Sequence, residues 1–318
     1  MQDTYGSADV LELRDIERPT PAANEVLIRV HSAGVNRGTL HLMTGEPYAM
    51  RLMGFGFRAP KNPVAGQEVA GTVVAVGADV TRFAVDGEVF GISKGSFAEY
   101  SAALEDKLAD KPENLTFDQA AAIGISGLTA LRALDVARVQ TGQSVLVVGA
   151  SGGVGTYTVQ IAVAMGAKVT GVCSSAKTDL VASLGAEHVI DYTVDDFADG
   201  TRKYDVILDI GGVSPVSRLR RALTPKGTLV IVGGEGGGTW SPGMGRQLEA
   251  VAMSPFVGQR LTMAMNKENF SGLERLAQLA TAGKITSVVE RSYPLAQVPD
   301  AIRHLEAGKA RGKVVIAI

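Results

Sequence analysis

Cysteine is almost absent from the 318-residue chain, which contains only Cys173. A single thiol cannot form an intrachain disulfide, and no cysteine cluster exists to hold a metal ion. No apolar run approaches about 18 residues, so we expect no membrane-spanning helix. The first residues also lack a basic segment followed by an apolar one, so we expect no signal peptide and a cytoplasmic location. We expect Cys173 itself to be a small buried hydrophobe at a strand end.

Charge of either sign is not in excess. Lys and Arg total 31 and Asp and Glu total 33, which gives a net charge of −2 and a pI near 6.1. This balance argues against a nucleic-acid-binding protein, and 46% hydrophobic residues argue against a disordered chain. We therefore expect a globular protein of two domains whose partner is a small molecule rather than a nucleic acid or a membrane.

Glycine is abundant, and it separates short apolar runs in the first third of the chain. Val26–Val30, Val69–Gly77 and Glu88–Gly91 read as strands bounded by turn residues such as Thr20-Pro21. Their pattern predicts an antiparallel, barrel-like sheet.

From Val145 onward, short apolar runs alternate with segments of helical periodicity. The predicted strands are Val145–Val148, Val169–Val172, His188–Ile190, Val206–Asp209, Thr228–Val232 and Arg260–Met265. Strands connected by helices favour a parallel sheet that is covered on both faces, the doubly wound α/β arrangement. The tail then predicts a helix over Phe270–Ala280, a strand over Val288–Tyr293, a helix over Pro299–Ala307 and a last strand over Val314–Ile316.

A glycine-rich loop joins the first of these strands to an apolar helix, Thr156–Met165. Its sequence, Ala150-Ser151-Gly152-Gly153-Val154-Gly155, matches the dinucleotide-binding fingerprint with Ala in the first glycine position. Gly152 would let the backbone approach a diphosphate, Gly155 would let the helix pack closely on the strand, and the helix N-terminus would attract the phosphates. The cofactor-binding candidates here are Gly149, Ser151, Gly152, Gly153, Val154 and Gly155. The alternative is a tight strand-to-helix turn that binds nothing.

The end of the second strand favours NADPH over NADH. An NAD site usually places Asp or Glu there to hold the ribose 2′-hydroxyl, but this chain has Ser174, Ser175 and Lys177, and its first acid is Asp179. Two hydroxyls and an ammonium group suit a 2′-phosphate. The alternative for Lys177 is a solvated surface lysine.

These features together resemble the medium-chain dehydrogenase/reductase superfamily, in particular its zinc-independent quinone oxidoreductases and oxoene reductases. The landmarks are Ala33-Gly34-Val35-Asn36, Gly66-Gln67-Glu68-Val69-Ala70-Gly71, Gly124-Ile125-Ser126-Gly127-Leu128-Thr129-Ala130, the glycine loop, Leu184-Gly185-Ala186, Val189-Ile190-Asp191-Tyr192 and Gly312-Lys313-Val314-Val315. The resemblance implies an α/β protein with a GroES-like β-barrel catalytic domain, residues 1–119 and 268–318, around a doubly wound Rossmann domain, residues 120–267. It also implies a first strand before Gln2–Gly6, which looks truncated here.

The resemblance implies that no metal is bound. Zinc-dependent relatives have Cys where this chain has Asn36, His where it has Gln67, and a third ligand near Ala121. The chain's histidines are scattered and lack ligand spacing; they are His31, His41, His188 and His304. We expect His31 to be packed or hydrogen-bonded.

The resemblance also assigns residues to the remaining parts of the site. Asn36 and Gln67 would face the nicotinamide as catalytic residues, unless their amides only hydrogen-bond within the barrel. Tyr48 lies in the segment 43–57, whose Met and aromatic residues, Met50, Met53 and Phe55 among them, suit an apolar acceptor pocket or simply pack on one another. Further cofactor contacts are implied at Thr129, Tyr192, Gly233, Gly234 and Lys313, although a lysine near the tail can also be solvated.

Without a metal, hydride transfer needs an acceptor that delocalises the charge it gains. A metal ion would otherwise supply several kcal/mol to a developing alkoxide. A quinone or an α,β-unsaturated carbonyl needs only positioning and a few hydrogen bonds, and water can supply the proton. We therefore expect an NADPH-dependent quinone or enone oxidoreductase. The alternatives are a zinc-free alcohol or enoyl-thioester reductase and a non-catalytic NADPH-binding protein.

Two further expectations concern assembly and loops. Family analogy and an unprotected apolar edge predict a homodimer through Arg260–Met265. The loops 43–60 and 235–258 would shape the acceptor pocket, and the glycines at 236–238 and 243 would let the second loop move.

Overall fold

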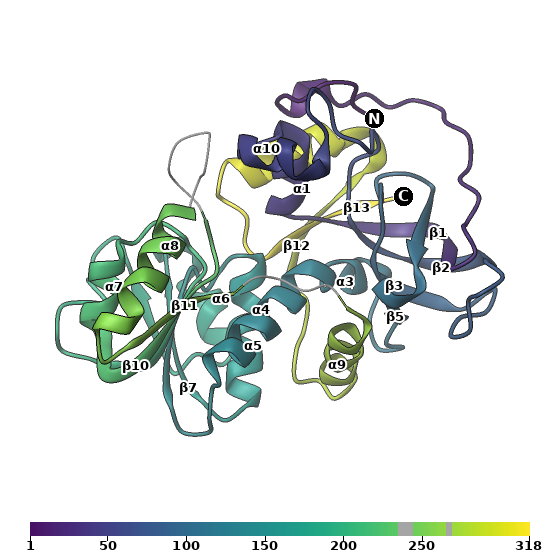
Figure 1. The fold of residues 1–318 in the computed structure, drawn as a ribbon. Coiled ribbons are helices and arrows are strands. Elements are labelled where there is room, and N and C mark those ends of the chain that lie inside the picture. Colours follow the sequence, from purple (N-terminus) through teal and green to yellow (C-terminus); the bar gives the residue numbers. More distant parts are fainter. Residues whose placement is uncertain (235–243, 265–268) are drawn as a thin grey trace. The chain divides into compact units, whose positions relative to one another are not determined.

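The computed structural model describes residues 1–234, 244–264 and 269–318. The chain divides into two compact units, Met1–Leu128 with Glu268–Ile318, and Thr129–Lys267 (Figure 1). The second unit is therefore inserted into the first, as the resemblance implies. The glycines predicted to move, at 236–238 and 243, lie outside the described residues.

The first unit contains a seven-stranded sheet with the order β12-β13-β1-β2-β3-β5, and β4 pairs with β1. Its strands are β1 (Glu25–Val35), β2 (Glu68–Val76), β3 (Glu88–Ile92), β4 (Tyr100–Leu104), β5 (Leu108–Asp110), β12 (Val289–Pro294) and β13 (Lys313–Ala317). All recorded pairs are antiparallel except β12–β13. The last strand of the chain, β13, pairs with the first, β1, so both chain ends contribute to one sheet. Strands β4 and β5 were missed because their Ala, Ser and Asp residues give weak strand signals.

Helices of the first unit pack against this sheet. They are α1 (Arg37–Thr44), α2 (Tyr48–Met50), α3 (Phe117–Ala121), α9 (Phe270–Thr281) and α10 (Val298–Glu306). A capping box at Thr116 starts α3, whose Asp118 accepts a hydrogen bond from Ser32 on β1. The carbonyl of Gln119 accepts another from Ser287 at 2.6 Å.

The first segment of the first unit ends inside α4 (Gly124–Ala137), at Leu128. Helix α3 and the first turn of α4 belong to this unit because they bond to it, Gln119 to Ser287 and Ile125 to Glu68. The predicted domain bounds, 1–119 with 268–318 and 120–267, stay a prediction.

The second unit is built on a six-stranded sheet with the order β11-β10-β9-β6-β7-β8. The strands are β6 (Ser144–Val148), β7 (Lys168–Cys173), β8 (His188–Asp191), β9 (Tyr204–Asp209), β10 (Leu223–Ile231) and β11 (Arg260–Met263). Every pair is parallel. The chain builds outward from β6 through β7 to β8, and then returns to β9 on the other side of β6. The direction of winding thus reverses between β6 and β9, which confirms the doubly wound Rossmann arrangement.

Described helices of the second unit include α5 (Gly153–Ala164), α6 (Thr178–Ser183), α7 (Val216–Ala222) and α8 (Met244–Met253). Residues 155–162 of helix α5 are all buried, which fits a helix that covers a parallel sheet. No helix within the described ranges combines the length and the apolarity that a membrane crossing needs.

Close approach of α5 to β6 depends on Gly155. A Cβ atom at this position would lie 2.1 Å from the carbonyl oxygen of Gly149 and 2.7 Å from the carbonyl carbon of Ala150. Both neighbours are backbone atoms that cannot move without displacing the strand end. Gly155 therefore has the packing role that the fingerprint predicts. At Gly152, by contrast, a Cβ would meet only the Gly149 oxygen, at 3.6 Å.

We predict that Gly155→Ala destabilises the protein by about 1–3 kcal/mol, because the added methyl forces α5 away from β6. Gly152→Ala is the matched control and should unfold at nearly the wild-type temperature. Calorimetric unfolding measures both. Equal unfolding temperatures for the two variants would contradict this account of the packing.

Candidate functional site

The glycine loop lies at the carboxyl end of β6 and leads directly into α5. The backbone N–H of Gly152 donates to the oxygen of Gly149 at 3.2 Å, which closes the turn. Gly152 is the N-cap residue of α5, and no side chain caps the helix there. The first N–H groups of a helix have no partner within the helix, and they carry about half a positive charge. This end of α5 is therefore suited to phosphate.

Two other loops pack against the glycine loop. Gly149 has φ +86°, and a Cβ there would lie 2.8 Å from the nitrogen of Gly211, just after β9. A Cβ at Gly233, after β10, would lie 2.1 Å from the oxygen of Ile210. The loops that follow β6, β9 and β10 thus pack together through glycine backbone atoms, with no side chain between them. The predicted residues Gly233 and Gly234 lie at the same sheet edge as the glycine loop.

Residues predicted to hold the adenosine half lie at the ends of β7 and β8. Ser174, Ser175 and Lys177 follow β7 directly. Tyr192 follows β8, and its N–H donates to the oxygen of Cys173 at 3.0 Å. The Tyr192 side chain is 59% exposed and thus open to a ligand. The structure brings these four residues together.

An acid that the sequence analysis missed belongs to this group. Asp191, at the end of β8, accepts a hydrogen bond from the hydroxyl of Ser175 and two from Thr193, from its N–H at 2.9 Å and its hydroxyl at 2.8 Å. These bonds, that of Ser175 foremost, hold the pKa of Asp191 below its usual value, so the group is a carboxylate at neutral pH. Asp191 belongs to a different strand from Ser175 and Lys177, and it reaches them only because Cys173 pairs with Asp191 across the parallel strands.

Cys173 and Thr129 complete the predicted residues of the second unit. The Cys173 side chain is buried, and this burial raises the pKa of its thiol to about 11, which confirms the structural role expected for it. Thr129 is half-buried in α4.

Asn36 in the first unit has both ends of its amide engaged. It caps α1 by accepting the N–H of Thr39 at 2.9 Å on Oδ1, and its Nδ2 donates to Glu68 at 2.9 Å. The residue is 7% exposed. In this structure the Asn36 amide therefore makes structural hydrogen bonds within the barrel.

Glu68 is the centre of a buried polar cluster. Its carboxylate is fully buried and accepts hydrogen bonds from the backbone of Ile125 at 2.9 Å and from Lys313 Nζ at 2.5 Å. Lys313 is 2% exposed and also donates to the hydroxyl of Ser126 at 3.1 Å. The Lys313 ammonium group is thus directed into this cluster, and the cofactor contact that the resemblance implies for Lys313 stays a prediction.

Gln67 has an unused acceptor close to Asn36. A Cβ at Gly38 would lie 2.9 Å from Asn36 Oδ1 and 3.0 Å from Gln67 Oε1, so the two amide oxygens flank Gly38. Gln67 Oε1 is buried and has no hydrogen-bond partner among the described residues. Buried polar atoms in native structures almost always have a partner. Gln67 therefore remains a candidate for holding a hydroxyl or N–H group of a ligand.

Tyr48 lies in a segment that folds on itself. The Arg51 guanidinium lies 4.5 Å from the centre of the Tyr48 ring and 4.3 Å from that of Tyr5. Its Nε donates to the oxygen of Gly45 at 2.9 Å. Packing within the segment thus explains the placement of Tyr48, whereas Phe55 is 44% exposed.

Zinc does not fit the residues at the ligand positions that the resemblance identifies. Zinc in proteins is bound by Cys, His and carboxylate groups. Here Asn36 and Gln67 offer amides, Ala121 offers no donor, and the described residues contain no group of three His, Cys, Asp or Glu side chains able to hold a metal. His31 stacks on Phe117 at 4.2 Å and hydrogen-bonds Thr72 at 3.0 Å, as expected for a packed histidine.

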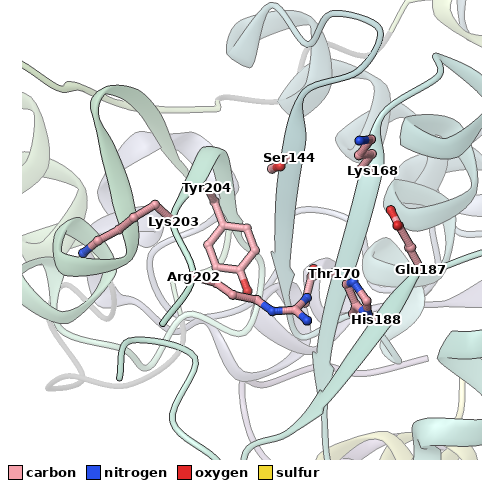
Figure 2. Close-up of a pocket in the computed structure, with 8 residues that line it drawn as sticks. All are labelled: Ser144, Lys168, Thr170, Glu187, His188, Arg202, Lys203 and Tyr204. Carbon is pink, nitrogen blue, oxygen red and sulfur yellow. The ribbon is translucent and has the colours of Figure 1, made fainter. Parts of the chain in front are cut away.

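A separate pocket of about 200 Å³ lies at the opposite edge of the second sheet, among the first residues of β6 to β9 (Figure 2). It is lined by Ser144, Lys168, Thr170, Glu187, His188, Arg202, Lys203 and Tyr204. In open α/β sheets, ligands bind at the carboxyl ends of the strands. The glycine loop, and not this pocket, therefore marks the candidate cofactor site.

A doubly wound parallel sheet with a glycine loop at its carboxyl edge, in a unit inserted between two segments of a barrel-like unit, is typical of dinucleotide-binding dehydrogenases. Family models agree with this: residues 22–113 match the "alcohol dehydrogenase GroES-like domain" and residues 184–316 the "zinc-binding dehydrogenase" family. The chain is 32% identical to the human quinone oxidoreductase over 99% of its own length and 95% of that protein. It is 33% identical to the 2-methylene-furan-3-one reductase of Solanum lycopersicum, over 98% of this chain and 76% of the relative.

A solved structure extends the comparison. The quinone oxidoreductase from Coxiella burnetii superposes with a TM-score of 0.87 at 28% identity, over 100% of this chain and 98% of that one. The chain belongs to the medium-chain dehydrogenase/reductase superfamily and is of the quinone oxidoreductase type. It is accordingly an oxidoreductase of a family that uses a nicotinamide cofactor.

We predict that Glu68→Gln lowers the stability of the protein by about 3–5 kcal/mol, because it leaves the buried Lys313 ammonium without a counter-charge. The double variant Glu68→Gln/Lys313→Met removes both charges and should recover most of this loss. Thermal unfolding compares the two. A double variant no more stable than Glu68→Gln would show that the ion pair does not carry this energy.

Proposed function

We propose that the protein is an NADPH-dependent, metal-free reductase of quinones or α,β-unsaturated carbonyl compounds. The observation that carries the proposal is that no side chain caps the N-terminus of α5 and that Gly152, its N-cap residue, has no side chain to block a phosphate. Relatives named as a quinone oxidoreductase and a furanone reductase support the acceptor class.

The chain's own residues would bind and orient the reactants. The first N–H groups of α5 would hold the diphosphate, and the bare backbone at Gly233 would allow close approach of the nicotinamide half. When bound, the cofactor supplies the hydride. Gln67 Oε1 would accept a hydrogen bond from a bound group. Because the described residues contain no donor set for zinc, the acceptor would itself delocalise the charge that it gains.

The apolar segment around Tyr48 supports an apolar acceptor. Leu52, Phe55 and Phe57 expose 71%, 44% and 69% of their surfaces to solvent. Exposed large hydrophobic side chains that are close in sequence are typical of ligand-binding or interaction surfaces. We propose that this segment contacts the ring or the chain of the acceptor.

Cofactor choice depends on opposing charges at the end of β7. Lys177 and the hydroxyl of Ser174 favour a 2′-phosphate, and Ser175 could donate to it only by turning its hydroxyl proton away from Asp191. The Asp191 carboxylate opposes it, but its oxygens are already bonded to Ser175 and Thr193. We propose that the balance favours NADPH.

We predict that Lys177→Ala lowers kcat/KM for NADPH about tenfold, because one charge-assisted contact to the phosphate is lost. The value for NADH should change by less than about twofold, since NADH has no 2′-phosphate to contact. Lys168→Ala, at the opposite sheet edge, is the control. Equal losses with both cofactors would contradict phosphate recognition by Lys177.

The acceptor class is tested by stopped-flow oxidation of NADPH against quinones, enals, enones and saturated ketones, with NADH in parallel. We expect rapid oxidation by the conjugated acceptors only. Reduction of saturated ketones at comparable rates without added metal would instead favour the alcohol reductase alternative. Tight NADPH binding without oxidation by any acceptor would favour a non-catalytic binding protein.

A homodimer through β11 is also proposed. Strand β11 is at the end of the sheet order, and Leu248, Val251 and Phe256, in the α8 region that precedes it, are 60%, 43% and 88% exposed. An open strand edge and nearby exposed apolar groups favour self-association.

We predict that light scattering at micromolar concentration gives twice the chain mass of 33.1 kDa. Phe256→Asp should shift the mass toward the monomer, because it introduces a charge into the apolar surface. Val194→Asp is the control, since Val194 is 76% exposed elsewhere in the same unit. A monomeric wild-type protein would exclude this dimer.

A further inference from the structure

Arg246 and Asp209 form a buried ion pair in the second unit. Asp209 is the last residue of β9 and is 0% exposed, and Arg246, on α8, is 18% exposed. Arg246 Nη2 donates to Asp209 Oδ2. The other carboxylate oxygen accepts the N–H of Gly212 at 3.3 Å. Burial raises the pKa of Asp209, and the Arg246 guanidinium opposes that effect.

This pair lies at the carboxyl edge of the sheet, where the glycine loop begins. Asp209 is directly opposite Val148 in the parallel ladder, and Val148 immediately precedes Gly149. The Asp209 carbonyl also accepts the N–H groups of Val232 and Gly233, each at 3.0 Å. Arg246 is therefore bonded to the residue that joins the loops after β6, β9 and β10.

Two of the three guanidinium nitrogens of Arg246 have no acceptor among the described residues. Its Nε and Nη1 are both buried and without a hydrogen-bond partner within the described part of the chain. A buried donor without an acceptor costs about 1–3 kcal/mol, and more for a charged group. The Asp209 carboxylate binds Nη2 alone, so Nε and Nη1 are two buried donors that an oxygen acceptor would satisfy. A guanidinium group prefers a carboxylate or phosphate oxygen.

We propose that Arg246 binds an anionic oxygen group of a ligand held at the carboxyl edge of this sheet, through Nε and Nη1. The chemistry is that of a carboxylate or a phosphate. Its source is either the cofactor's diphosphate or a carboxylate on the acceptor. The inference builds on the proposed function, since it assumes that cofactor and acceptor bind at this edge.

A structural role is the competing explanation. Arg246 connects α8 to the end of β9, so its loss would loosen the helix whatever the ligand. The variants must therefore separate the ion pair from the free donors. Arg246→Lys keeps a positive charge next to Asp209, but one ammonium group cannot place donors at both the Nε and the Nη1 positions. Arg246→Gln removes the charge. Arg218→Gln, which breaks an exposed pair with Asp196, is the matched control.

Calorimetric titration supplies readouts that need no turnover. The ligands are NADPH, and then, on the protein loaded with NADP⁺, a neutral naphthoquinone and its carboxylate-bearing analogue. We expect Arg246→Lys to unfold near the wild-type temperature and to weaken the binding of one anionic ligand by about tenfold or more, the effect of losing one or two charge-assisted hydrogen bonds.

Each outcome has a meaning. A loss confined to the carboxylated quinone supports the inference with the acceptor as the source of the anion, and a loss for NADPH supports it with the cofactor as the source. Unchanged affinities for all three ligands in both Arg246 variants, with or without a lower unfolding temperature, would overturn the inference and leave the proposed function intact. Failure of the wild-type protein to bind NADPH would instead overturn the proposed function, and the inference with it.

Discussion

Contact between Gly155 and the carbonyl of Gly149 sets the geometry of the candidate cofactor site. Because no side chain separates α5 from β6, the helix begins directly above the strand end, and Gly152 leaves its first N–H groups uncovered. The loops after β9 and β10 meet the same point with bare backbone. A phosphate group can thus approach peptide dipoles at this edge without moving a side chain.

In the first unit, amides occupy the positions at which the resemblance implies metal ligands in zinc-dependent relatives, Asn36 and Gln67. The fully buried Glu68 carboxylate is satisfied by Asn36, by Lys313 and by backbone N–H groups. An internal ammonium group thus neutralises this carboxylate. Among the described residues, the buried Gln67 Oε1 has no hydrogen-bond partner and could accept a bond from a ligand.

Much of the fold follows from local patterns in the sequence. The runs that become β6, β7, β9 and β10 are rich in β-branched and aliphatic residues, as strands buried on both faces require. The glycine loop was recognisable from its fingerprint, and the structure shows steric reasons for Gly149 and Gly155. Strands β4 and β5 were not predicted because they are short and contain Ala, Ser and Asp, and only their pairing with β1 and β3 defines them.

Site residues were harder to predict wherever a contact joins distant segments. Asp191 comes next to Ser175 only through the β7–β8 register. Lys313 reads as a surface lysine until β13 places it against Glu68, 245 residues away. Arg246 has no motif around it, and only the structure shows that it pairs with Asp209 and that its Nε and Nη1 lack acceptors among the described residues. Sequence spacing cannot report partners of this kind.

The central claim is that a phosphorylated nicotinamide dinucleotide binds at the glycine loop. A crystal structure of the protein grown with NADPH tests it most directly. The account predicts electron density for the diphosphate at the first N–H groups of α5, and for the 2′-phosphate beside Ser175 and Lys177. An empty glycine loop at saturating cofactor, or a metal ion coordinated by Asn36 and Gln67, would contradict it.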